Sequence, residues 1–432
     1  MRKTLFTWVL LSSLVLPQMF AQAAPTGSGY PYADPYVATI LGTPNDMRAP
    51  MVKDIPVKLI DRTIFPERKV PDIFWYNEKL RSSLAYQKGK APLMFVIAGT
   101  GAGFNSNKML ALQSIYFQAG FHVVSISSPT HANFITAASE SGTPGIVKDD
   151  ARDLYRVMQK IWAEIKDEVE VSDFYLSGYS LGGTQAAFVS LLDEEQKRFN
   201  FRKVLMINPA VSLYASVTRL DRMLDDNIPG GLQKTGEALD GMMQKLAQRY
   251  KAGDFVKLDN EFLYNIYRGL PEPPKDDNLQ ALIGLSFRVS SSNMMFASDV
   301  MTDAGFVVPK GVGPQLDNSD SLNEYLRTLL YINFGKYLDE FLLPAAQAKD
   351  PKLTRQALID GDSLKSIQDY LSRTQKIGVV TNADDIILAP GELDFLRQQL
   401  GTRATIFPHG GHCGNIDDRE MAAVLTQYFA RP

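Results

Sequence analysis

The chain contains little cysteine and little histidine: its 432 residues include one cysteine, Cys413, and four histidines. A single cysteine excludes a disulfide bond within the chain, so stability must come from burial of an apolar core, which this length allows. The formal net charge is only -3, and runs of like charge are short. This balance gives no electrostatic reason to expect a nucleic-acid partner or binding to an anionic membrane surface.

The first residues of the chain have the features of an export signal. Arg2 and Lys3 precede an apolar run at 5–19, and the A-Q-A triplet at 21–23 offers a cleavage site. We therefore expect residues 1–23 to be a cleaved signal peptide and the protein to be periplasmic or secreted. The run is short for a membrane span, and an uncleaved anchor is the alternative. No later stretch is long and apolar enough to cross a bilayer, so we expect no integral membrane span after cleavage.

Short apolar runs alternate with helix-like segments, which is typical of a parallel sheet covered by helices. Six runs have the length and continuous apolar character of strands buried on both faces: 93–98, 122–126, 173–177, 203–207, 377–381 and 403–407. Between them, residues 149–166 repeat apolar side chains at helical spacing. The pattern predicts an α/β fold with a mostly parallel central sheet.

The same rhythm divides the chain into segments. We assign 24–90 to an N-terminal arm with edge strands, and 91–212 together with 373–432 to the α/β core. Residues 24 to about 50 are rich in glycine and proline and are expected to be extended or looped. Residues 213–372 show few strand signals and are expected to form a mostly helical cap. Methionines in this insert would be core filler or the flexible lining of a substrate cavity.

The pentapeptide G-Y-S-L-G at 178–182 lies between a predicted strand and a predicted helix. This G-x-S-x-G pattern is typical of a nucleophile elbow, a sharp turn that exposes a serine. Gly178 and Gly182 supply the small residues that the turn needs where strand and helix nearly collide. The context predicts Ser180 as a nucleophile, and an ordinary glycine-rich turn is the alternative.

A serine hydroxyl needs a base within hydrogen-bond reach, and four histidines are available. His412 lies between glycines just past the last predicted strand, so we prefer it to His409, which follows a proline. His122 opens a buried strand and is expected to be structural. His131 lies on a loop near the site and could touch substrate, although a structural role is favoured. We interpret Cys413, beside His412, as a packing residue of the site wall.

The base in turn needs an orienting carboxylate, which should follow the preceding strand. Asp384 and Asp385 are both there, and adjacent residues cannot both point at one imidazole. We prefer Asp385 because it falls three residues after Asn382 and precedes an apolar run. Asp384 is the alternative acid, and two solvated turn carboxylates would be the non-catalytic interpretation.

The reaction also needs donors for a developing oxyanion, and backbone N–H groups are the usual ones. The residue after the serine, Leu181, provides one. The second is expected from the A-G-T-G-A-G turn at 98–103, with Thr100 as the donor. A glycine-rich turn can instead hold a phosphate, but no lysine follows as a P-loop requires.

The order Ser180, Asp385, His412, with the G-Y-S-L-G elbow and the G-G-H loop, resembles the α/β-hydrolase superfamily. The resemblance covers about 90–212 and 373–432. It implies that the helical insert is a cap between the sixth and seventh core strands. Many members carry His-Gly in the oxyanion turn where this chain has Ala-Gly, but backbone donors do not need that histidine.

The resemblance implies hydrolysis of an ester, thioester or amide through an acyl-enzyme, with no metal or organic cofactor. We expect an exported, carboxylesterase-like serine hydrolase acting on a small-molecule or lipid-like acyl substrate. Peptidase or amidase, lipase and acyltransferase activities are alternatives on the same fold. A non-catalytic binding protein on a hydrolase scaffold is the alternative from another class. The sequence carries no indication of oligomeric state.

Overall fold

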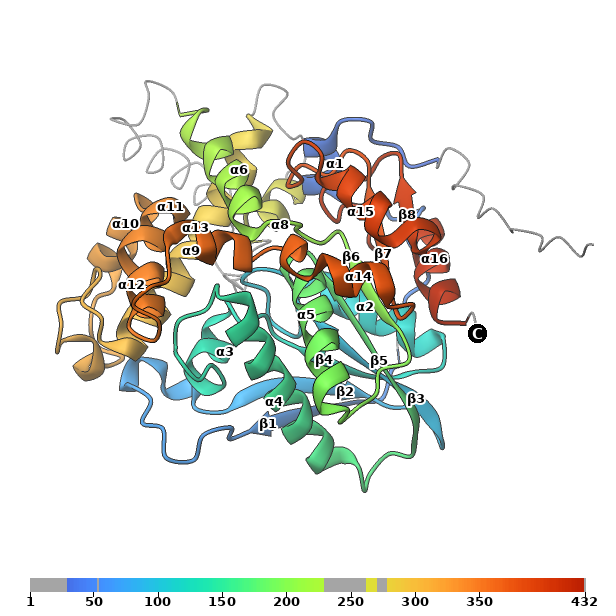
Figure 1. Cartoon of the computed structure of the whole chain (residues 1–432), viewed down its shortest axis with the longest axis horizontal. Coiled ribbons are helices and arrows are strands. Elements are labelled where there is room, and N and C mark those ends of the chain that lie inside the picture. Colours follow the sequence, from blue (N-terminus) through green and yellow to red (C-terminus); the bar gives the residue numbers. More distant parts are fainter. Residues whose placement is uncertain (1–28, 53, 229–261, 270–277, 431–432) are drawn as a thin grey trace, which may run out of the picture.

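The structure is a computed structural model, and it describes residues 29–52, 54–228, 262–269 and 278–430. The expected signal peptide lies outside these residues. An eight-stranded sheet forms the centre, in the order β1-β2-β4-β3-β5-β6-β7-β8 (Figure 1). The strands are β1 (Val57–Arg62), β2 (Leu80–Ala85), β3 (Ala91–Ile97), β4 (His122–Ile126), β5 (Val171–Tyr179), β6 (Val204–Ile207), β7 (Ile377–Asn382) and β8 (Ala404–Phe407). Strand β2 runs antiparallel to both of its neighbours, and the ladder from β4 to β8 is parallel.

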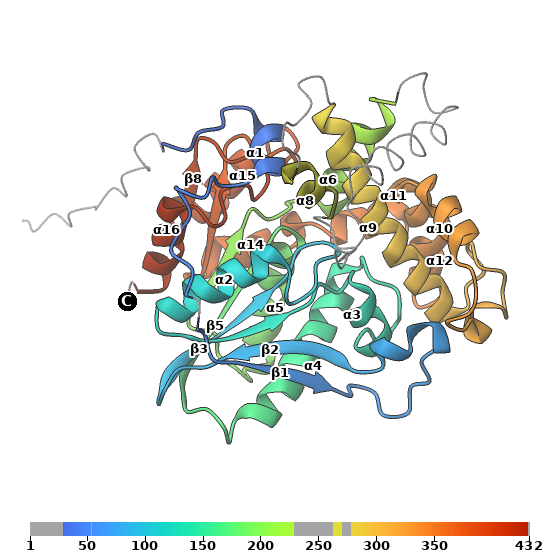
Figure 2. The same cartoon turned by 180° about the vertical axis from the view of Figure 1, so that it is seen from behind.

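The six strands expected from the apolar runs are present as β3 to β8. Strands β4, β6 and β7 are buried along their whole length, which is why their sequences are apolar without alternation. Helices α4 (Val147–Ile165) and α5 (Leu181–Gln196) cover one face of the sheet, and α2 (Asn107–Gln118) and α16 (Arg419–Ala430) cover the other (Figures 1 and 2). The mostly parallel, helix-covered sheet predicted from the sequence is therefore confirmed.

A helical insertion follows β6, as expected for an α/β-hydrolase architecture, and the chain returns to the sheet at β7. Its helices are α6 (Leu213–Asp225), α8 (Phe262–Arg268), α9 (Leu279–Thr302), α10 (Asn323–Leu330), α11 (Phe334–Tyr337), α12 (Leu343–Gln347), α13 (Arg355–Gly361) and α14 (Gln368–Arg373). The two ends of the insertion are tied together, because the Leu364 N–H donates to Val211 O at 2.8 Å. Among the described residues, no helix combines the length and apolar character that a bilayer span requires.

Helices α6 and α9 pack unusually closely within the insertion. A Cβ on Gly284 of α9 would stand 2.4 Å from the Leu224 nitrogen of α6, so only glycine allows this approach. One turn further on, the buried Arg288 guanidinium donates to Asp221 at 2.8 Å and to Asp225 at 3.0 Å. The contact fixes α6 against α9, and both helices face the site.

The N-terminal arm differs from the expectation of an extended segment, which was wrong for α1 (Pro35–Leu41). Asp34 accepts hydrogen bonds from the Tyr36 and Val37 amides, and Pro35 stands at the first helical position, so the helix is well started. The segment after β4, where His131 was expected on a loop, likewise contains a short helix, α3 (Ala132–Ala137), which His131 caps. These helices are only seven and six residues long, too short for apolar periodicity to reveal them.

Candidate active site

Ser180 occupies the turn between β5 and α5 with φ 54° and ψ -126°, a conformation that L-residues seldom adopt. The surrounding glycines make the turn possible. A Cβ on Gly178 would lie 2.3 Å from Gly182 O, and one on Gly182 would lie 2.3 Å from Ile97 O in β3. The backbone thus has the strain and close approach expected of a nucleophile elbow.

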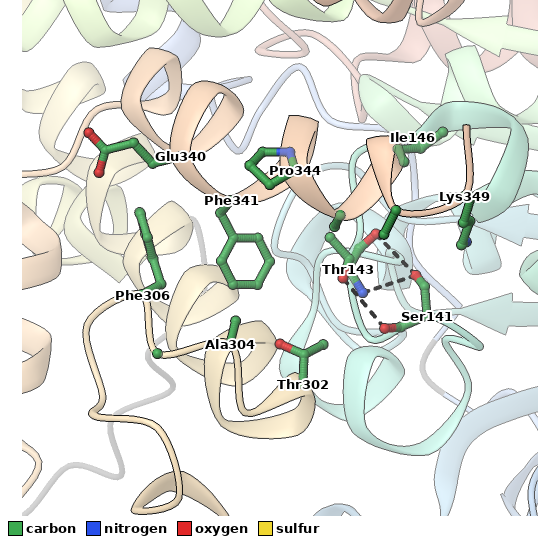
Figure 3. Close-up of a pocket in the computed structure, with 13 residues that line it drawn as sticks. Ser141, Thr143, Ile146, Thr302, Ala304, Phe306, Glu340, Phe341, Pro344 and Lys349 are labelled. Atoms are coloured by element: carbon green, nitrogen blue, oxygen red, sulfur yellow. Dashed lines mark hydrogen bonds between the residues drawn. The ribbon is translucent and has the colours of Figure 1, made fainter. Parts of the chain in front are cut away.

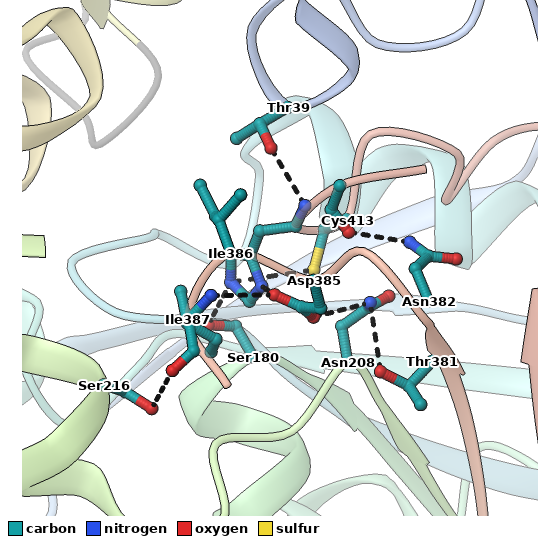
Figure 4. A network of polar contacts seen from close by, with 12 residues as sticks. Thr39, Ser180, Asn208, Ser216, Thr381, Asn382, Asp385, Ile386, Ile387 and Cys413 are labelled. Carbon is teal, nitrogen blue, oxygen red and sulfur yellow. Dashed lines mark hydrogen bonds and ion pairs between the residues drawn. The ribbon is translucent and has the colours of Figure 1, made fainter. Parts of the chain in front are cut away.

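The side chain of His412 reaches Ser180 from the loop after β8. Its Nε2 lies 2.9 Å from the Ser180 Oγ. The loop turns through Gly410 and Gly411, both with positive φ. The His412 amide donates to Thr39 Oγ1 of α1 at 2.9 Å, which ties the loop to the N-terminal helix (Figure 4). The sequence contained no signal for this role of Thr39.

The two candidate acids have different partners. Asp385 lies with its Oδ1 3.0 Å and its Oδ2 3.2 Å from the His412 Nδ1. Asp384 instead accepts hydrogen bonds from the amides of Gly410 and Gly411, at 3.3 and 2.9 Å. The structure therefore brings Ser180, His412 and Asp385 into one hydrogen-bonded chain, and Asp384 braces the loop that carries the histidine.

A residue that the sequence reasoning missed, Asn208, supports Asp385 from the end of β6. Its Nδ2 donates to Asp385 Oδ2 at 2.8 Å, and the Ile387 amide donates to Oδ1 at 3.1 Å (Figure 4). Asn208 is fully buried at φ 44°, a region that asparagine tolerates better than most residues. Its position directly after a buried strand, at the edge where the site lies, was the signal available in the sequence.

The cap helix α6 also holds the loop that carries Asp385. Ser216 Oγ donates to Ile387 O at 3.0 Å, and Arg219 Nε donates to Ile386 O at 3.0 Å. Figure 4 shows Ser216 and Ile387 on the same side of the network as Ser180. Asp385 is thus positioned by the core through Asn208, and the loop that follows it is held by the cap through two carbonyl contacts.

Two opposing effects act on the His412 imidazole. Burial lowers its pKa, but the neighbouring Cys413 sulfur and the Asp385 carboxylate outweigh burial and raise the pKa above its usual value. The Cys413 Sγ lies 3.9 Å from Nε2 and is buried. Cys413 lines the cavity at the serine, which agrees with its interpretation as a residue of the site wall.

The remaining histidines are not part of this hydrogen-bonded chain. His122 accepts from the Gln87 amide at 3.0 Å and lies within β4, in the structural role expected for it. His131 accepts from the Asn133 amide at 3.2 Å, and burial lowers its pKa to about 4. His409 lies 3.6 Å from Asp384 and is 44 % exposed.

The two residues expected to bind an oxyanion, Leu181 and Thr100, both line a cavity that Ser180 borders. Leu181 is the first residue of α5, so its N–H has no partner within the helix. In the turn after β3, the amides of Gly101 and Ala102 donate to Thr130 Oγ1 and Gly99 O. Thr100 donates no backbone hydrogen bond within the described part of the chain, and it lines both cavities at Ser180.

One cavity of the described structure does not include the serine. It has a volume of about 600 Å³ and lies between α12 and the loop before α4, with Phe306 and Phe341 in its wall (Figure 3). Ser180 instead borders two smaller cavities of about 80 and 60 Å³. No cluster of three or more metal-ligating side chains occurs in the residues that the structure describes.

No protein-family model matches the chain, and no curated protein matches it by sequence. Solved structures resemble it at low identity. The thioesterase domain from the curacin biosynthetic pathway is 12% identical, covering 88% of this chain and 100% of that one, with a TM-score of 0.39. Est1E from Butyrivibrio proteoclasticus is 12% identical over 82% of this chain and 96% of that one, at a TM-score of 0.36. The Pyrococcus furiosus esterase Pf2001 is 11% identical, covering 87% of this chain and 93% of that one, with a TM-score of 0.41. At these values the likenesses say nothing about what this chain acts on.

Proposed function

We propose that the chain is a serine hydrolase that cleaves a carboxylic ester through an acyl-enzyme. The observation that carries the proposal is the hydrogen-bonded chain from Ser180 Oγ through His412 to Asp385, with steps of 2.9 and 3.0 Å. These are the distances at which a base activates a hydroxyl and a carboxylate orients the base. A strained backbone at Ser180 is consistent with a site under functional constraint.

In the proposed mechanism, the Ser180 Oγ attacks the acyl carbon while the His412 Nε2 accepts its proton. The Asp385 carboxylate holds the ring so that Nε2 faces the serine, and it stabilises the imidazolium that forms. The amides of Leu181 and Thr100 bind the oxyanion. His412 then donates its proton to the leaving oxygen as the carbon–oxygen bond breaks. Water attacks the acyl-enzyme by the same route and releases the acid.

Labelling of the purified protein with a fluorophosphonate probe tests the proposal. We expect stoichiometric labelling at Ser180 and none in Ser180→Ala, with labelling retained in the control Ser319→Ala, an exposed loop serine. Equal labelling of the Ser180 variant would overturn the proposed nucleophile. Absence of labelling in a folded wild-type protein would favour the binding-protein alternative. A matched ester and amide pair separates esterase from amidase, and added alcohol acceptors reveal acyl transfer.

Export is part of the proposal and rests on residues 1–23, which lie outside the described residues. Cleavage after the A-Q-A triplet would leave Ala24 as the first residue. Cell fractionation followed by mass spectrometry of the intact protein tests this. We expect a periplasmic or secreted chain lacking 23 residues, and a membrane-bound chain of the full 48.0 kDa would favour an uncleaved anchor.

A further inference from the structure

The turn that carries Thr100 is rich in glycine, and its shape depends on contacts outside the turn itself. Its sequence at 98–103 is A-G-T-G-A-G. Gly101 has a φ of 67°, and a Cβ on Gly99 would lie only 2.7 Å from the Tyr179 ring of the elbow, so glycine is needed at both positions. Glycine also loses more conformational freedom on folding than any other residue. A turn of this composition therefore has to be fixed by its neighbours.

Segment 126–130, at the end of β4 and directly after it, is hydrogen-bonded to this turn along its length. Two of the bonds join backbone groups, and in two others a side-chain hydroxyl accepts from a backbone amide. The pairs are Ala98 N–H to Ile126 O (3.1 Å), Ser128 N–H to Ala102 O (3.0 Å), Phe104 N–H to Ser127 Oγ (2.9 Å) and Gly101 N–H to Thr130 Oγ1 (2.7 Å). Of these four, the bond to Thr130 is the shortest, and it alone holds a residue adjacent to Thr100.

Thr130 is itself held in a fixed position. Its Oγ1 lies 2.9 Å from the Ser128 Oγ, and its amide donates to the same Ser128 oxygen at 3.3 Å. Pro129 stands between them, and its ring restricts the backbone to one value of φ. Thr130 is buried and lines the cavity of about 60 Å³ that Ser180 borders. Its hydroxyl is therefore a rigidly placed acceptor beside the candidate oxyanion turn.

We infer that Thr130 is a positioning residue for the oxyanion site: its hydroxyl holds the Gly101 amide and thereby fixes the orientation of the Thr100 amide. The inference rests on the proposed function and adds a residue to its machinery. Thr100 lies between Gly99, which packs closely on the elbow, and Gly101, which Thr130 holds, so the chain is fixed on both sides of it. A donor stabilises a developing oxyanion best when it is oriented before the charge appears. Without the Thr130 hydroxyl, the glycine-rich turn would lose the contact that fixes it next to Thr100.

Steady-state kinetics of Thr130→Val on a p-nitrophenyl ester test the inference, with wild-type protein already shown to label at Ser180. Valine keeps the size of the side chain but removes the acceptor for the Gly101 amide. Because the oxyanion develops only in the transition state, we expect kcat to fall about 10- to 100-fold while KM stays nearly unchanged. Inhibition by a trifluoromethyl ketone, whose adduct with the serine carries an oxyanion, should weaken by a similar factor. Thr130→Ser keeps the hydroxyl and should restore most of the kcat and of the inhibitor affinity.

Thr354→Val is the matched control. The Thr354 hydroxyl likewise accepts from a backbone amide, that of Ala357 at 3.1 Å, but Thr354 lines neither cavity at the serine, so kcat and inhibitor affinity should not change. Ser128→Ala removes the hydroxyl beside Thr130 and should lower kcat in the same way but less, and it decides the question if Thr130→Val does not fold.

Three results would overturn the role of Thr130. They are an unchanged kcat and inhibitor affinity in the deciding variant, a raised KM with kcat unchanged, and equal losses in Thr130→Val and Thr130→Ser. Absence of labelling in the folded wild-type protein would instead refute the proposed function.

Discussion

Replacing Gly182 by alanine tests the close approach on which the site depends. A methyl group there would lie 2.3 Å from Ile97 O and 2.6 Å from Ala98 O, both backbone atoms at the end of β3. Ordinary contact begins at 3.4 Å, so the helix and the strand must separate by about 1 Å. The strand is not free to move, because Ile97 pairs with Ile126 on one side and with Gly178 on the other, so the displacement falls on the start of α5.

We expect the displacement of α5 from β3 to lower the rate of catalysis more than it lowers the free energy of unfolding. Overpacking of this kind costs about 1–3 kcal/mol, and the two backbone clashes place this site at the upper end. Alanine recovers about 1 kcal/mol through its helix propensity, so we expect a net loss of about 2 kcal/mol. The same displacement moves Ser180 relative to the Thr100 amide, which follows Ile97 by three residues. A misplacement of about 1 Å costs roughly 100-fold in rate.

Gly183→Ala is the matched control, since it adds the same methyl group one residue further along α5. Its nearest neighbours would be backbone atoms at 3.1 to 3.3 Å, so shifts of a few tenths of an ångström suffice. Kinetics on a p-nitrophenyl ester and thermal unfolding should show a large loss of kcat/KM in Gly182→Ala and a small one in Gly183→Ala. Equal kinetics in the two variants would refute the argument from the close approach.

Three further predictions follow from polar contacts in the structure. In steady-state kinetics, Asp385→Asn should lower kcat by roughly 10²–10⁴-fold, whereas Asp384→Asn should retain most activity. The reverse order of effects would assign the orienting carboxylate to Asp384. The pKa of His412 is raised, and only the neutral imidazole can accept a proton from the serine. We therefore expect kcat/KM to rise with pH through a midpoint above 6.5, the usual pKa of histidine. A midpoint at or below 6.5 in a pH–rate profile would contradict this. Arg288→Met leaves the Asp221 carboxylate buried without its counter-charge and should lower the free energy of unfolding, measured by urea denaturation, by about 3–5 kcal/mol. The double variant Arg288→Met with Asp221→Leu should lose less. Equal losses in the two variants would show that the unpaired charge does not cause the destabilisation.

The sheet and the order of the site residues were predictable because each depends on local pattern. Parallel strands buried on both faces must be apolar throughout, so β3, β4, β6 and β7 could be predicted from short apolar runs. The elbow needs small residues at fixed offsets from Ser180, and those offsets are visible in the sequence. The histidine loop was visible because glycines flank His412 directly after a predicted strand.

The supports of the site could not be predicted, because they come from distant segments that only the fold brings together. Thr39 lies 373 residues before the amide that it binds, and Asn208 lies 177 residues before Asp385. The choice between Asp384 and Asp385 likewise depended on where each side chain points at the end of β7. The sequence places both carboxylates directly after β7, but it does not reveal which way each side chain points.

The cap has two physical roles that are linked through α6. On one side, Ser216 and Arg219 hold the carbonyls that follow Asp385, so α6 helps to fix the position of this proposed acid. On the other, Val217 of the same helix lines a cavity of about 60 Å³ that Ser180 borders. A change that displaces α6 should therefore alter both the rate of the chemistry and the preference for acyl chains. Substitutions in the wall of this cavity that leave α6 in place should change the preference alone, which separates selectivity from catalysis in this fold.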